Sequence, residues 1–179
     1  MDKEKLTAAA LECGAANAAV IAVPDIPFRR EFRAACEQNT CGKFSKCWMC
    51  PPDVGDIDKL IEDAKTYRQA LVFQSVGQLE DSFDIEGMSR CAIEHNKIIQ
   101  ALSDKLLPVL DNPVILGAGA CHVCESCTKL QDEPCRHPGR AVAPMEAYGI
   151  AVSELAALCG MKYINGQNTV TYFGGFLFR

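Results

Sequence analysis

Features that would identify several common protein classes are missing from this 179-residue chain. No apolar stretch approaches the roughly 20 residues that a membrane-spanning helix needs. The sequence contains no G-x-G-x-x-G, no P-loop and no G-x-S-x-G, the motifs that mark nucleotide-binding loops and the serine nucleophile of many hydrolases. We therefore expect neither a membrane span nor a nucleotide-binding loop.

Positive charge is also scarce. Lys and Arg number 18 against 23 Asp and Glu, which gives a net charge of −5 and a pI near 5.2. A nucleic-acid surface needs a clustered positive face, so we expect no nucleic-acid partner. The one local basic group, Arg29, Arg30 and Arg33, is interpreted as a solvated helix face. A hydrophobic share of 49% and a mean hydropathy of +0.01 are typical of a globular protein.

Cysteine, in contrast, is abundant, with 11 residues. The N-terminal segment reads MDKEKLTAAALECG; Glu12 interrupts its apolar part and no convincing cleavage site follows, so we expect a cytoplasmic protein. Cytoplasmic thiols are kept reduced, and a chain of this length does not need disulfides to stabilise its core. Metal binding or redox chemistry is therefore the predicted use of the cysteines.

Eight of the cysteines form two groups of four. In the second group, within GACHVCESCTKLQDEPCRH, three cysteines recur every three residues, a period that fits neither a strand nor a helix. Exposed thiols beside charged residues would oxidise, so we predict that both groups are metal-binding quartets in loops. The quartets are Cys36-x4-Cys41-x5-Cys47-x2-Cys50 and Cys121-x2-Cys124-x2-Cys127-x7-Cys135.

An iron–sulfur cluster is the predicted occupant of the second quartet. A C-x2-C-x2-C run lets three thiolates converge on one [4Fe–4S] cube while N–H groups of the same loop point at its sulfur atoms. The fourth ligand comes from farther along the chain, and Cys135 could close its own quartet or the other one. Zinc is the alternative, above all for the first quartet, which has a single C-x2-C pair.

The other three cysteines are predicted to be small buried hydrophobic residues, because they fall within or at the end of apolar helical segments. Cys91 and His95 are spaced so that both could reach one metal ion, yet they share the apolar face of their helix, so a buried pair is preferred. The three cysteines are Cys13, Cys91 and Cys159.

Several other side chains lie next to the quartets in the sequence. His122 lies inside the second quartet and His137 follows it; either could be a spare ligand, and an interaction with the sulfur atoms is preferred because the thiolate count is already complete. Trp48, between two cysteines of the first quartet, would shield a cluster from water or anchor its loop. Arg136 and Arg140 add positive charge near a cluster or belong to a solvated loop.

Helical and strand patterns alternate along the chain. They predict helices over 2–13, 27–38, 88–107 and 152–159, and one more helix with an apolar face formed by Leu60, Ile61, Ala64 and Tyr67. Strands are predicted over 18–23, 70–76 and 113–119. A final hairpin is predicted over 161–178, with its turn at NGQN. We therefore predict one α/β (α+β) layered domain over 1–179, with a mixed central sheet, flanking helices, a C-terminal β-hairpin and cysteine-rich loops at the ends of elements.

Four segments, in this order, resemble a family of small cysteine-rich proteins of anaerobic bacteria and archaea, catalogued as predicted metal-binding proteins of unknown function. The segments are CGKFSKCWMCPP, GACHVCESCTKLQDEPCRHP, PMEAYGI and NTVTYFGGFLF. The similarity spans roughly 36–179. It implies that the cysteines of both quartets are metal ligands and that iron–sulfur clusters are suspected. In outline the chain also resembles, more weakly, corrinoid-dependent reductases that hold two cubane clusters.

The expected function is an electron-transfer or redox module that carries one or two [4Fe–4S] clusters and works with a redox partner protein or a small-molecule substrate. An iron–sulfur enzyme, possibly a corrinoid-linked reductase, is the first alternative. A zinc-binding structural or interaction module is the second. The enzyme would need a pocket, whose candidate lining residues are Trp48, His122, His137, Glu146 and Tyr148.

Overall fold

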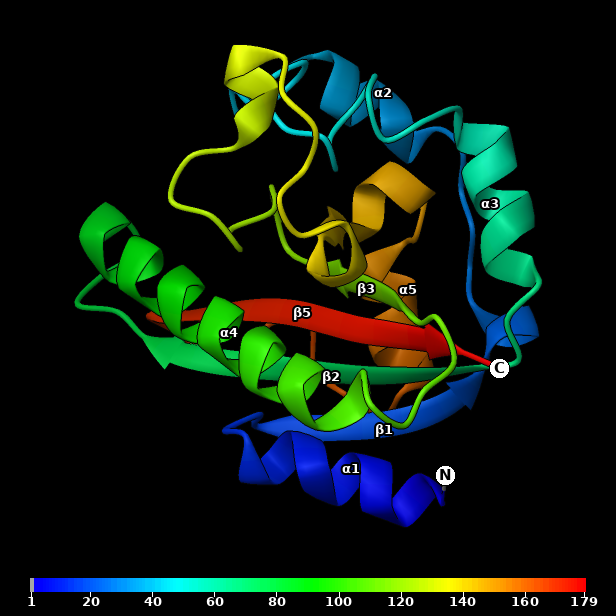
Figure 1. Cartoon of the computed structure of the whole chain (residues 1–179). Coiled ribbons are helices and arrows are strands. Elements are labelled where there is room, and N and C mark those ends of the chain that lie inside the picture. The colour runs from blue at the N-terminus through cyan, green and yellow to red at the C-terminus, as the bar shows by residue number, and fades with distance from the viewer. Residues whose placement is uncertain (1) are drawn as a thin grey trace.

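The computed structural model describes residues 2–179, which form a five-stranded sheet flanked by helices (Figure 1). The strands are β1 (Asn17–Ala22), β2 (Gln69–Gln78), β3 (Val114–Gly117), β4 (Val142–Pro144) and β5 (Thr169–Phe178). The helices are α1 (Lys3–Glu12), α2 (Phe32–Glu37), α3 (Ile57–Lys65), α4 (Ile85–Leu106) and α5 (Val152–Leu158). The strand order is β1-β2-β5-β3-β4, and only β3 and β4 run parallel to each other. The predicted mixed sheet with flanking helices is confirmed.

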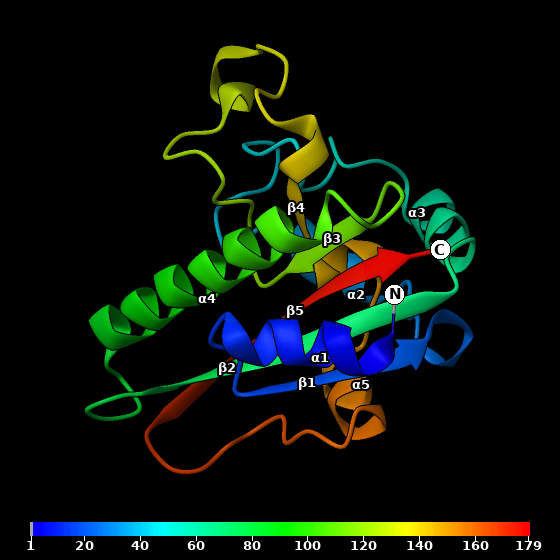
Figure 2. The ribbon, with the colours of Figure 1, turned by 60° about the horizontal axis from the view of Figure 1, so that its bottom comes forward.

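Both faces of the sheet are covered by apolar side chains. On one face α1 and α4 lie side by side (Figure 2), and Leu102 of α4 belongs to the same buried cluster as Phe176 of β5. On the other face, Leu155 of α5 and Ala64 of α3 pack in a second cluster with Val72 of β2. The hydrophobic effect therefore stabilises a three-layer arrangement, with the sheet in the middle.

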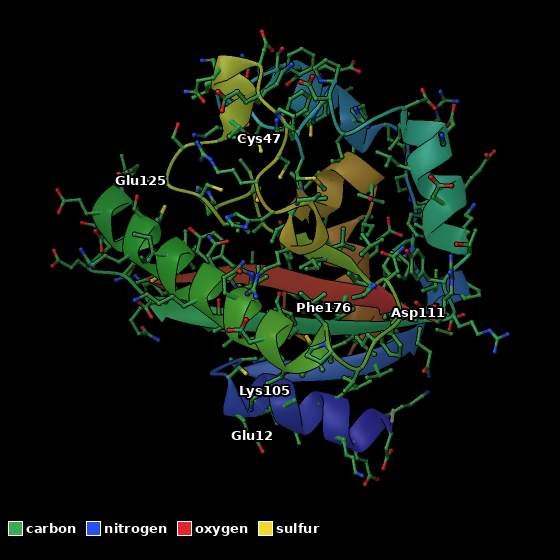
Figure 3. All side chains as sticks on the ribbon, viewed as in Figure 1. Glu12, Cys47, Lys105, Asp111, Glu125 and Phe176 are labelled. Atoms are coloured by element: carbon green, nitrogen blue, oxygen red, sulfur yellow. The ribbon has the colours of Figure 1, made fainter. Side chains whose placement is uncertain are left out.

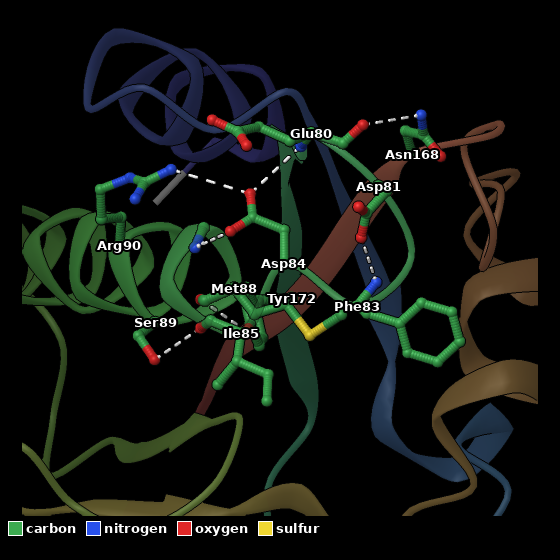
Figure 4. Close-up of polar contacts among 11 residues, drawn as sticks. Glu80, Asp81, Phe83, Asp84, Ile85, Met88, Ser89, Arg90, Asn168 and Tyr172 are labelled. Atoms are coloured by element: carbon green, nitrogen blue, oxygen red, sulfur yellow. Dashed lines mark hydrogen bonds and ion pairs between the residues drawn. The ribbon is translucent and has the colours of Figure 1, made fainter.

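The longest helix, α4, begins where a capping carboxylate accepts backbone N–H groups. Asp84 accepts hydrogen bonds from Gly87 N at 2.7 Å and from Glu80 N at 3.1 Å (Figure 4). All four positions of the predicted apolar stripe are buried: Ile98, Ile99, Leu102 and Leu106. Among residues 2–179, no helix, α4 included, has the length and apolar composition that crossing a membrane requires.

The predicted C-terminal hairpin is wrong. The tail contributes one strand, β5, which lies between β2 and β3 and pairs with both of them. The segment before it folds into a loop, because the Asn165 side chain donates hydrogen bonds to Lys162 O and to Thr171 Oγ. Met161 of this segment is buried in an apolar cluster and the Tyr163 ring stacks on that of Phe173, so the segment packs on the sheet without forming a strand. The strand partners of β5 instead come from distant parts of the chain.

The helix predicted over 27–38 is shorter than expected, since α2 starts at Phe32. Phe28 forms an isolated β-bridge with Ile150, and Arg29 N donates a hydrogen bond to Gly149 O, so the chain is extended there. Arg33 is not part of a solvated face: it is 7% exposed and donates to Gly55 O at 2.8 Å. Its guanidinium holds the start of α3 against α2.

His95 occupies the interface between α4 and the sheet, as the preferred buried-pair interpretation requires. It is 1% exposed, and its Nδ1 lies 2.8 Å from Ser75 Oγ. Its ring contacts those of Phe73 and Tyr172, with centroids 5.7 and 5.8 Å away. Burial lowers the pKa of His95 to about 4, so the ring is neutral in the folded protein.

The buried histidine makes stability depend on pH. The unfolded chain protonates His95 near its usual pKa of 6.5 and the folded protein only near 4, so stability is expected to fall as the pH drops through this window. The pKa difference between the folded and unfolded states corresponds to a loss of about 3 kcal/mol in the free energy of unfolding. Urea unfolding of wild type and His95→Gln from neutral pH to about pH 4 measures it, because acid effects elsewhere cancel in the comparison. Equal pH dependence of the two proteins would contradict the assignment.

Candidate metal centre

Seven of the eight cysteines of the predicted quartets lie in two loops that meet at one end of the sheet, and Cys36 lies in the last turn of α2, before the first loop. The first loop joins α2 to α3, and the second is the crossover that the parallel strands β3 and β4 require. Figure 3 shows Cys47 where the two loops approach each other. Loops placed this way by a rigid sheet commonly carry the functional residues of a protein.

The first of two neighbouring cavities, which we name the closed cavity, is lined by five thiols and has a volume of about 20 Å³. Trp48, Met49, Arg136 and His137 also line it, so Arg136 lies near the candidate site as one of the two interpretations from the sequence expected. Thiolates are the usual ligands of iron–sulfur clusters and also bind zinc, so the chemistry of this donor set suits either group. Its thiols are those of Cys47, Cys121, Cys124, Cys127 and Cys135.

The second cavity, which we name the open cavity, is larger, at about 320 Å³, and is lined by three thiols. They belong to Cys36, at the end of α2, and to Cys41 and Cys50 in the loop that follows. Glu146 and Lys43 also line this cavity. Its donor set likewise fits a metal, with room left for a further small molecule.

The cavities divide the cysteines differently from the sequence. The second quartet stays together, and Cys135 lines the same cavity as the C-x2-C-x2-C run. The first quartet does not: Cys47 lines the closed cavity, while Cys36, Cys41 and Cys50 line the open one. Within residues 2–179, no three His, Cys, Asp or Glu side chains are close enough to hold a single metal ion. Which of the eight thiols bind metal stays a prediction.

Cys47 and Cys50 form a pair of unequal acidity at the boundary between the cavities. The Cys50 thiol donates a hydrogen bond that lowers the pKa of Cys47 to about 5, and N–H groups of Met49 and Cys121 act in the same direction. The shared hydrogen bond, together with burial, raises the pKa of Cys50. Backbone N–H groups also point at the second loop, since Val142 N lies 3.5 Å from Cys121 Sγ. Donors of this kind stabilise sulfur ligands that carry negative charge.

The pKa values of two groups of the open cavity are raised. Burial and the neighbouring Glu146 carboxylate raise the pKa of Cys36. Burial likewise raises the pKa of Glu146. The buried Arg33 guanidinium acts in the opposite direction on Cys36. The open cavity thus brings thiols together with a carboxyl group in a partly desolvated space.

A set of side chains that we name the clasp joins the two cysteine loops. Lys129 Nζ lies 2.8 Å from Asp53 Oδ1, with both side chains only about 15% exposed, and 4.5 Å from the centroid of the Trp48 ring. Trp48 Nε1 donates a hydrogen bond to Glu133 O at 2.9 Å. Trp48 therefore anchors its loop as well as lining the closed cavity. Sequence reasoning missed Lys129 and Asp53, because nothing in the spacing pairs positions so far apart.

Removing the clasp cation should weaken metal binding. Lys129→Ala leaves Asp53, whose Oδ2 is already buried without a partner, with no counter-charge, and it frees the Trp48 ring. Changes to groups that position metal ligands typically lower metal affinity ten- to a hundred-fold, so about tenfold is expected here. Competition with a chelator measures it. Lys97→Ala, which removes a surface pair with Glu94 on α4, is the control; equal metal loss from both variants would rule out the clasp.

The remaining candidates lie in several places. Glu146 lines the open cavity, His122 faces a groove along α4, and Tyr148 borders a separate apolar cavity near the end of α4. They do not form one pocket with Trp48 and His137. The isolated cysteines are only half-buried, but Cys13 and Cys159 pack against the two apolar clusters and Cys91 lies against Gly77 of β2.

The chain was compared with known proteins. Residues 19–178 match a family model described as "Predicted metal-binding protein (DUF2284)". The match includes both cysteine loops and all eight cysteines that line the two cavities. No curated protein and no solved structure matches.

Proposed function

The chain belongs to the DUF2284 family of predicted metal-binding proteins, and from this premise we propose that it is an iron–sulfur protein with an electron-transfer or redox role. The proposal assigns one or two [4Fe–4S] clusters to the cavities between the cysteine loops. One observation carries it: the eight cysteines that the spacing singled out surround two adjacent cavities, and the other three lie elsewhere. A cluster in this position would supply one-electron chemistry.

The number of the thiols and their spacing along the sequence favour clusters over zinc. Four thiolates around one zinc ion, each about 2.3 Å from it, lie about 3.8 Å apart. A [4Fe–4S] cube bonds each thiolate to a different iron, so its ligands are spread more widely. No three candidate ligands within residues 2–179 have the geometry of a single-ion site. Eight thiols are also enough to ligate two clusters.

The protein groups around the closed cavity are suited to protecting a cluster. Trp48 and Met49 line its wall and limit the access of water, which influences the reduction potential. The N–H group of Val142 donates to a thiol there, and the cation of Lys129 lies over the Trp48 ring. Hydrogen bonds, nearby charge and solvent exposure are the means by which a protein tunes such a cluster.

Spectroscopy of anaerobically purified protein tests the proposal. Iron, acid-labile sulfide and visible absorption that bleaches on addition of dithionite are expected, with about four or about eight irons per chain. Zinc gives no visible absorption and does not change oxidation state. Stoichiometric zinc with a flat visible spectrum would therefore overturn the proposal.

A further inference from the structure

The open cavity contains fewer thiols than a four-cysteine cluster site needs. Cys36, Cys41 and Cys50 line it, and the charges of all three lie close enough to influence one another. Cys47 would complete the quartet by sequence, and its sulfur shares a hydrogen bond with Cys50, but it also contacts Cys127 and the Cys121 N–H group and lines the closed cavity instead of the open one. The division of the eight thiols is therefore three and five.

The free volume is divided in the opposite way. The cavity with three thiols has about 320 Å³ of space and the cavity with five has about 20 Å³. A volume of 320 Å³ is at the lower end of the range for small-molecule sites. Its wall combines apolar groups, such as Phe44 and Pro144, with the polar side chains of Gln38 and Thr40. The cavity with the incomplete thiol set is thus also the one that could admit a ligand.

The charged groups indicate which ligands would enter. Lys43 is the one cationic residue among those that line the open cavity, and it is exposed. Arg33 adds a buried positive charge near Cys36. Glu146 is the one acidic residue of the lining, and Glu37 is a second acidic residue near Cys36. Lys43 is the charged group of the lining that is exposed to solvent, and an exposed cation attracts small anions.

We propose, building on the function proposed above, that the open cavity holds its cluster through Cys36, Cys41 and Cys50 alone and that the remaining iron position takes a small anionic ligand that enters beside Lys43. The closed cavity then holds the second cluster through the second quartet, with Cys47 in excess. A substrate or a small anionic effector would reach the metal only on the open side.

Two cysteines of one C-x2-C pair provide matched variants, Cys50→Ser and Cys47→Ser. Cys50→Ser leaves two thiols in the open cavity and is expected to lose about half of the iron. Cys47→Ser leaves three thiols there and four in the other cavity, so its iron content should equal that of the wild type. If the four cysteines of the first quartet held one cluster together, as their spacing suggests, the two variants would lose equal amounts of iron.

Cyanide, a small anion, serves as the probe of the open iron position. With isotope-labelled cyanide, the EPR spectrum of the reduced wild type and of Cys47→Ser should show hyperfine coupling to the label, and that of Cys50→Ser should not. Lys43→Ala is expected to weaken cyanide binding about threefold, because the removed charge is exposed. Glu146→Gln should leave the spectrum without cyanide unchanged, since Glu146 is not a ligand in this assignment.

The outcomes separate the two proposals. Wild type that contains no iron contradicts the proposed function, and this inference with it. Wild type with about eight irons per chain but no coupling to cyanide contradicts the inference alone. Iron loss in Cys47→Ser equal to that in Cys50→Ser, or a changed spectrum in Glu146→Gln, would show that a fourth protein ligand occupies the position.

Discussion

Cys124→Ser is expected to lose about half of the iron of the anaerobically purified protein, because it removes the middle thiol of the C-x2-C-x2-C run. Cys124 lines the closed cavity and also the groove along α4. None of the other seven thiols around the two cavities lines that groove, and Cys47 approaches the cluster site from the side of Cys121 and Cys127. The excess thiol is therefore not placed to replace Cys124. Iron and sulfide analysis measures the loss.

Cys159→Ser is the matched control. Cys159 follows α5 and packs against the apolar cluster on the face of the sheet that α3 and α5 cover. Burial raises its pKa to about 11, so its thiol stays protonated at neutral pH, whereas metal ligands are thiolates. We expect unchanged iron and a stability change within about 1 kcal/mol. Equal iron loss from Cys124→Ser and Cys159→Ser would contradict the division of the cysteines into ligands and packing residues.

Loss of the metal should loosen the cysteine loops more than the sheet. The two main apolar clusters lie on the faces of the sheet, and of the eight candidate ligands only Cys121 packs against one of them. The chain thus has a core that does not depend on metal, unlike a small zinc finger. Cys124→Ser should therefore retain its far-ultraviolet circular dichroism spectrum while its loops become more sensitive to proteolysis, as regions with few buried contacts do.

The cysteine spacing predicted where the candidate site lies but not how its thiols are divided. A period of three excluded regular structure and placed the second quartet correctly in one loop. Local spacing could not show that Cys47 and Cys50 line different cavities, because only two residues separate them in their C-x2-C pair. That division depends on how the second loop folds over the first, a long-range contact that includes Lys129 and Asp53. A contact between residues so far apart in the sequence cannot be predicted from a local pattern.

The fold was predictable where an element carries its own periodicity. The apolar stripe of α4 and the apolar run of β2 needed no partner to be recognised. The three-residue β4 was missed because it is too short to show a pattern. The tail was predicted as a hairpin because local turn chemistry favoured neighbouring strands, whereas β5 pairs with β2 along ten residues and with β3 along three. Pairing between distant strands depends on the whole sheet.

The central position of β5 gives Phe176→Ala a large expected effect on stability. Phe176 is 0% exposed and faces Leu71 and Ile115 on the two neighbouring strands. Its ring stacks with that of Phe73, with centroids 6.4 Å apart. Replacing a fully buried phenylalanine by alanine loses the stabilisation from burying the ring and leaves a cavity. Together the two effects lower the free energy of unfolding by about 3–5 kcal/mol. Urea unfolding should show a loss of that size.

Phe83→Ala provides the control for the same chemical change. Phe83 is 87% exposed in the turn before α4, where its ring points away from the neighbouring side chains (Figure 4). Its backbone N–H group, which donates to Asp81 Oδ1 at 2.7 Å, is unaffected by the substitution. The expected change is within about 0.5 kcal/mol. If the tail formed a separate surface hairpin, Phe176→Ala would resemble Phe83→Ala, so a small effect at Phe176 would contradict the central placement of β5.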